Sequence, residues 1–132
     1  MSPWFKKEPT PPKGPDFSQV DSLAKALQLA GEGTLEKMYL MPMEFGGADI
    51  PQNVVYVPVG MAAEKARIDF DVVRPLIRQG KVTEYTATPE YQGRSFIPIA
   101  VRIVASSPGQ FSATLNLWGV ALARDQERGQ RG

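Results

Sequence analysis

The stretch that decides the fold is Ser95-Phe-Ile-Pro-Ile-Ala-Val-Arg-Ile-Val-Ala105, followed after a Ser-Ser-Pro-Gly turn by Phe111-Ser-Ala-Thr-Leu-Asn-Leu-Trp-Gly-Val-Ala-Leu122. In both runs apolar residues alternate with polar or small ones, the period of a strand with one buried face. A third strand-like run, residues 81–88, precedes them, and the turn at 89–93 joins it to the next. Three such runs predict an antiparallel meander with one face covered.

Two helices are predicted upstream of the meander. Apolar residues at helical spacing predict a helix over 17–30, capped by Asp16 or Ser18. A longer helix is predicted over 60–79, where Pro75 either opens a second short helix or kinks one helix.

Two further strands are predicted between these helices, at residues 34–42 and 53–57, with a Gly- and Pro-containing loop at 44–53 between them. The expected fold class is therefore α+β: an antiparallel sheet of about five strands with two helices on one face, in the order α-β-β-α-β-β-β.

The domain is expected to cover residues 16–122. Residues 1–15 contain five of the twelve prolines and are expected to form a flexible arm, in which Trp4 and Phe5 are the apolar residues. Residues 123–132 are expected to form a flexible charged tail.

Composition restricts the chemistry of the chain. Its 132 residues are 42% apolar, enough for one core, and include no cysteine and no histidine. This excludes zinc fingers, iron–sulfur clusters, thiol nucleophiles, disulfides and Ser-His-Asp triads. What remains is chemistry by carboxylate, Lys, Arg, Tyr or Ser/Thr side chains, or no chemistry at all. Of these we prefer a protein that is not an enzyme, with no catalytic residues, no metal and no cofactor.

Charge and hydropathy restrict the partners and the location. The net charge is +1, but the excess positive charge lies in the two tails, so the body carries about −2. A nucleic-acid partner is not expected, because such proteins usually carry a basic stripe on the folded part. No run is long and apolar enough for a membrane span and no secretory leader is recognisable, which favours the cytoplasm.

The loop at 44–53 is the first candidate binding element, with Glu44, Phe45 and Asp49 as contact residues. Its paired glycines do not form a phosphate loop, because no Lys-Ser or Lys-Thr follows them. We expect them to serve positive φ angles.

The longer helix carries a group of charges. Its carboxylates are expected to lie on a solvated face among Lys65 and Arg67, although Lys65 itself falls on the apolar stripe of the helix. The carboxylates are Glu64, Asp69 and Asp71.

The second candidate binding element is the turn that carries Glu90, Tyr91 and Arg94. Its alternative role is cross-strand pairing and turn stabilisation. Trp118 falls out of alternation, on the polar face of its strand, which favours either cover by the N-terminal arm or a contact site.

Residues 45–58 (Phe-Gly-Gly-Ala-Asp-Ile-Pro-Gln-Asn-Val-Val-Tyr-Val-Pro), 80–82 and 85–98 together resemble small bacterial immunity proteins of polymorphic-toxin, contact-dependent or type VI secretion systems. The resemblance covers residues 34–118 and not the tails. It implies a cytosolic antidote that binds a cognate toxin protein and blocks the toxin's active site. It implies no catalytic residue.

Three hypotheses follow, in order of preference. The first is a toxin inhibitor that acts by occlusion. The second is a self-associating structural or accessory protein, a homodimer in which the edge strand of the meander pairs with a second copy. The third is a His-free, carboxylate-dependent hydrolase that uses Glu84 or Glu90.

Overall fold

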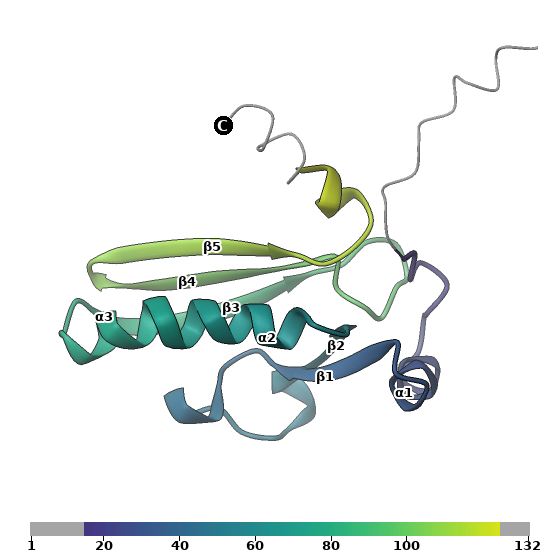
Figure 1. Ribbon diagram of the computed structural model, residues 1–132, viewed down its shortest axis with the longest axis horizontal. Coiled ribbons are helices and arrows are strands. Elements are labelled where there is room, and N and C mark those ends of the chain that lie inside the picture. Colours follow the sequence, from purple (N-terminus) through teal and green to yellow (C-terminus); the bar gives the residue numbers. More distant parts are fainter. Residues whose placement is uncertain (1–14, 125–132) are drawn as a thin grey trace, which may run out of the picture.

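A computed structural model of the chain describes residues 15–124, which form an α+β domain (Figure 1). The predicted arm and tail lie outside the described residues, apart from Pro15, Ala123 and Arg124. Within the described part, five antiparallel strands and three helices follow the order α-β-β-α-β-β-β-α. The last helix begins at Val120.

The strands form two sheets, so the prediction of one five-stranded sheet with two helices on one face was wrong. β1 (Leu35–Tyr39) pairs with β2 (Val54–Pro58), with Leu35 opposite Pro58 and Tyr39 opposite Val54. The other three strands, β3 (Val82–Glu90), β4 (Ala100–Pro108) and β5 (Gln110–Asn116), form a separate sheet in that order. The sequence pattern shows which side of a strand is buried but not which strand lies beside it, and for that reason it missed the division.

The meander is confirmed, with shifted boundaries. β3 (Val82–Glu90), β4 (Ala100–Pro108) and β5 (Gln110–Asn116) pair in antiparallel register, with Glu90 opposite Ala100 and Ala100 opposite Asn116.

The predicted strand residues 95–99 form instead an irregular buried segment. The amide of Phe96 donates to the Val20 carbonyl (2.6 Å), and the Ser95 hydroxyl donates to the Phe17 carbonyl (2.8 Å). These bonds join residues 95 and 96 to the start of the described chain, and only Ile99, whose amide donates to the Glu90 carbonyl (2.8 Å), bonds to a neighbouring strand.

Helix α1 (Leu23–Gly31) is shorter than predicted and is capped by Ser22, whose hydroxyl accepts from the Lys25 amide. It packs against β1. Its buried residue is Ala26, whereas Leu23 and Leu27 are each 48% exposed.

A single long helix covers Met61–Arg78. It consists of α2 (Met61–Ala66), a π-helical segment η4 (Arg67–Val73) and α3 (Arg74–Arg78). α2 packs against β1 and β2, while α3 packs against β3, so this helix connects the two sheets (Figure 1). Pro75 lies in the first turn of α3, one of the two predicted placements.

A carboxylate from β1 caps the start of this helix. The Glu36 side chain accepts hydrogen bonds from the amides of Gly60 (2.8 Å) and Ala62 (3.1 Å). It satisfies two amides that have no partner within the helix, and it fixes the helix to the two-stranded sheet.

The main core lies where the segment 95–99 meets both sheets. Its fully buried side chains include Val57, Ile97, Ile99 and Ile103. Trp118 belongs to this core and is 2% exposed. β5 ends at Asn116, before Trp118, and a turn at Gly119, whose φ is +67°, leads into the final helical turn that begins at Val120.

Candidate functional site

The connection between β1 and β2 forms the candidate binding loop. It contains two short 3-10 turns, η2 (Met43–Phe45) and η3 (Pro51–Asn53). The Asn53 side chain holds the loop together: it accepts from the Met41 amide (2.8 Å) and donates to the carbonyls of Met41 (3.0 Å) and Ala48 (2.9 Å). These side-chain bonds satisfy backbone groups of the loop that are not paired within a sheet, and they give this long connection a defined shape.

The two glycines of this loop have different functions. Gly46 has a φ of +103° and ends η2, as expected for a glycine that serves a positive φ. Gly47 is required for space, because a Cβ there would overlap the Met41 carbonyl oxygen.

Phe45 fixes the loop to the rest of the domain. Its ring makes edge-to-face contacts with Tyr85 on β3 (5.2 Å between centroids) and with Phe70 on η4 (5.8 Å). Glu44, next to it, is exposed. Phe45 is therefore partly a packing residue, while Glu44 remains available to a partner.

A groove of about 590 Å³ opens beside Phe45, between the loop, α3 and the start of β3. Its apolar lining includes Phe45, Tyr85 and Ile77, and Ile77 is 38% exposed. A smaller hollow of about 370 Å³ lies on the other side of Glu44, against Lys65, Asp69 and Phe70. The η2 turn thus separates two depressions.

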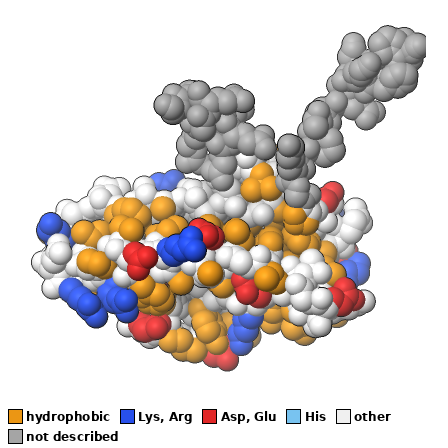
Figure 2. All heavy atoms as spheres, viewed as in Figure 1, with side chains coloured by type: hydrophobic (Ala, Val, Ile, Leu, Met, Phe, Trp, Pro, Cys, Tyr) orange, Lys and Arg blue, Asp and Glu red, His pale blue; other side chains and the backbone are white. Residues whose placement is uncertain are grey.

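The rim of the larger groove is charged. Arg74 and Arg78, one helical turn apart, lie on the α3 side, and Glu44 and Glu84 on the others. Arg74 stacks on the Phe70 ring at 4.9 Å. Neither arginine makes an ion pair with any residue of the range 15–124. The face in Figure 2 likewise shows acidic and basic side chains interspersed over apolar surface.

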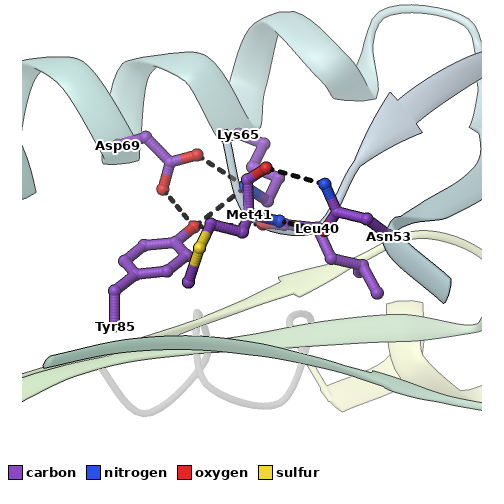
Figure 3. A network of polar contacts seen from close by, with 6 residues as sticks. All are labelled: Leu40, Met41, Asn53, Lys65, Asp69 and Tyr85. Atoms are coloured by element: carbon purple, nitrogen blue, oxygen red, sulfur yellow. Dashed lines mark hydrogen bonds and ion pairs between the residues drawn. The ribbon is translucent and has the colours of Figure 1, made fainter. Parts of the chain in front are cut away.

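A buried polar network lies beneath both depressions (Figure 3). Lys65 donates to Asp69 at 2.6 Å and to the Tyr85 hydroxyl at 2.9 Å, and that hydroxyl donates to the other Asp69 oxygen at 2.6 Å. The side chains of Lys65 and Asp69 are only 3% and 2% exposed. The expectation of a solvated face was therefore wrong for these two residues.

The network shifts the proton affinity of its members. Burial lowers the pKa of the Lys65 ammonium, although the hydrogen bond and charge of Asp69 oppose that shift. Burial, together with the hydrogen bond to Asp69, raises the pKa of the Tyr85 phenol far above its ordinary value. Tyr85 therefore remains a protonated donor.

Asp69 lies in the π-helical segment, four residues after Lys65. Lys65, Asp69 and Val73 are all buried and follow each other at a spacing of four residues. Residues four apart are neighbours on one side of a helix, so this side of the long helix is the buried one. The sequence signal was the place of Lys65 on the apolar stripe.

The other predicted site residues do not join the groove. Asp49 pairs with Lys37 at 2.8 Å and lines a third hollow of about 240 Å³, together with Ile50 and Phe96. The hydrogen bond that the Lys37 ammonium donates to the Asp49 carboxylate raises the pKa of Lys37. The loop at 44–53 therefore presents two separate surfaces.

The second predicted element is exposed, but part of it has a structural function. Glu90 accepts a bidentate pair from Arg124 (2.9 and 3.0 Å), which lowers the pKa of Glu90 and fixes the last described turn to β3. Tyr91 and Arg94 are exposed beyond the end of β3.

Trp118 is buried, which contradicts the contact-site alternative of the prediction; the other alternative, cover by the N-terminal arm, concerns residues that lie outside the described part, apart from Pro15. Its indole N–H donates to the Ile97 carbonyl at 3.2 Å, and its ring meets Phe17 edge to face at 5.8 Å. The strand period ends at Asn116, so alternation could not place the residues that follow.

Comparisons of the chain with protein-family models, curated proteins and solved structures find no match. In residues 15–124 no helix is long and apolar enough to cross a membrane. The same range contains no group of three acidic side chains placed to hold a metal ion.

Proposed function

We propose that this chain is a cytoplasmic immunity protein, a non-catalytic domain that binds a cognate toxin domain and blocks it by occlusion. The observation that carries the proposal is the groove beside Phe45. It combines an apolar floor, an exposed Ile77 and a rim with two arginines that have no ion pair among the described residues.

Such a groove has the anatomy of a protein-binding surface. Affinity in protein interfaces comes mainly from a few buried anchors, while charges at the rim set orientation and association rate. The floor here is preorganised, because Phe45 packs on two aromatic rings and Asn53 ties the loop backbone. A preorganised surface loses less conformational entropy when it binds.

The arrangement of carboxylates gives less support to the hydrolase alternative. Glu84 and Glu90 lie six residues apart on β3, which places them roughly 20 Å apart along the strand. Glycosidase carboxylate pairs are at most about 9.5 Å apart. The two residues therefore cannot act as a pair.

The test is co-expression with the product of the adjacent gene, combined with a pull-down. We expect the neighbour to be toxic alone, and this chain to protect the cells and to form a stable complex. If the neighbour is harmless by itself and no complex forms, the immunity proposal fails.

Two groove variants locate the surface. Arg78→Glu and Ile77→Asp change exposed side chains at the groove and should weaken protection and complex formation. Arg102→Glu is the matched control, an equal charge reversal at an exposed position on β4 outside the groove. Protection that is lost equally in all three variants, or in none, would contradict the groove as the toxin-binding surface.

A further inference from the structure

β5 differs from the other edge strands in its chemistry. Its seven residues, Gln-Phe-Ser-Ala-Thr-Leu-Asn, include no charged residue and no proline. Edge strands usually carry such residues, because they prevent pairing with another chain. The other exposed edges follow that rule: β1 contains Glu36 and Lys37, β2 ends at Pro58, and β3 contains Glu84, Pro89 and Glu90.

The hydrogen-bond pattern shows which backbone groups of β5 point away from the sheet. The Leu117 amide donates to the Ile99 carbonyl (2.7 Å), and the Ser107 amide donates to the Gly109 carbonyl (2.9 Å). Both bonds fit the β4–β5 register. The residues that continue β5 at its two ends, Leu117 and Gly109, both have odd numbers. In an antiparallel pair every second residue bonds to the partner strand. The amides and carbonyls of Ser112 and Thr114 therefore point outward.

No described strand receives these outward groups. Among residues 15–124, β5 pairs with β4 alone and forms the outer margin of the sheet (Figure 1). Phe111 and Ala113, on the covered face of the sheet, remain half-buried at this margin. Phe111 extends the small core cluster of Val73, Val82 and Ala105.

We infer that β5 pairs with β5 of a second copy of this chain, which gives a continuous six-stranded antiparallel sheet. The register that overlaps the whole strand places the two-fold axis at Ala113. Ser112 then exchanges backbone hydrogen bonds with Thr114 of the second copy, and Phe111 lies beside Leu115 of the second copy. This pairing satisfies the outward groups and covers the half-buried apolar margin. It is independent of the proposed immunity function.

The experiment measures the mass of the full chain by sedimentation velocity across a wide concentration series. We expect a monomer that becomes a dimer as concentration rises. Ser112→Pro removes an outward amide and leaves the β4 ladder intact, since proline is tolerated where an edge N–H faces away from the sheet. Each dimer loses two hydrogen bonds, which should raise the dissociation constant about 30-fold.

Two further variants make the result decisive. Ser112→Ala keeps the amide and should dimerise like the wild type. Ser112→Lys places a charge on the edge without a proline and should remain monomeric while keeping the wild-type circular dichroism spectrum. A wild-type chain that stays monomeric throughout overturns the inference. So does a dimer that persists in both Ser112→Pro and Ser112→Lys, or a β5-dependent complex that forms only with a different protein.

Discussion

Replacing Lys65 with methionine tests whether the buried network stabilises the fold. The substitution keeps most of the side-chain volume but leaves the Asp69 carboxylate, 2% exposed, without its cation at 2.6 Å. Removing one partner of a buried ion pair costs about 3–5 kcal/mol, because the remaining charge is uncompensated. A domain of this size is stable by about 5–15 kcal/mol, so Lys65→Met should remove a large part of the free energy of unfolding.

The double variant Lys65→Met/Asp69→Leu distinguishes the effect of losing the whole ion pair from the effect of leaving one charge buried without its partner. With both charges gone, no uncompensated charge remains, and apolar replacement of a buried pair is often neutral or stabilising. We therefore expect the double variant to be more stable than Lys65→Met by about 2 kcal/mol or more, a clear departure from additivity. In the double variant the Tyr85 hydroxyl has lost both Lys65 and Asp69 and keeps only its 3.4 Å contact with the Leu40 carbonyl. Adding Tyr85→Phe removes this buried hydroxyl.

The assay is urea unfolding of the full chain followed by circular dichroism, with the slope m compared between variants. Arg67→Met is the matched control on the same helix, because its ion pair with Glu64 is 68% and 44% exposed and should change the stability by less than about 0.5 kcal/mol. If Lys65→Met stays within about 1 kcal/mol of wild type, or if the two single changes simply add, the network does not stabilise the fold as argued.

Three further predictions concern stability. Trp118→Phe removes the N–H donor to the Ile97 carbonyl and should lower the free energy of unfolding by about 1–3 kcal/mol; an unchanged value would contradict the buried placement. Gly47→Ala should lower the melting temperature because the new Cβ overlaps the Met41 carbonyl. Gly31→Ala is the control and should not lower it, because Gly31 has open space around it and is not among the glycines with a positive φ. Equal effects of the two substitutions would refute the claim that Gly47 is required for space. Above about pH 10 an unfolded Tyr85 loses its proton while the folded one keeps it, so the free energy of unfolding should fall as pH rises, and more steeply in wild type than in Tyr85→Phe. Parallel pH curves would show that Tyr85 is not linked to folding.

The order of elements as far as β5 was predictable because hydrophobic periodicity reports local geometry, whereas the final helical turn from Val120 was missed. Alternation along residues 97–103 and 111–118 predicted the meander, and Gly80 together with the proline-containing turns limited the segments. Periodicity contains no information on neighbours, so it could not show that the long helix lies along two sheets instead of one. It also failed at Trp118, because the chain had already left the strand.

The candidate site was predictable in part. A loop rich in glycine and acidic residues drew attention to Glu44 and Phe45, and both border the groove, while their role in binding stays a prediction. The place of Lys65 on the apolar stripe was a signal of burial, but it did not identify the buried pair, because an oppositely charged pair four residues apart is also the pattern of a solvated helix face. What distinguishes the two cases is Tyr85, twenty residues further along the chain, and only the tertiary fold brings its hydroxyl to the pair.

The polar network and the binding loop are mechanically connected through Tyr85. Its hydroxyl is held by Asp69 and Lys65, and the ring that carries this hydroxyl is the surface on which Phe45 packs. Apolar contacts alone are not directional, whereas two short hydrogen bonds fix both the position and the rotation of a ring. The position of the loop therefore depends on the contacts between the long helix and β3. A change at Lys65 should disturb the groove as well as the stability of the domain.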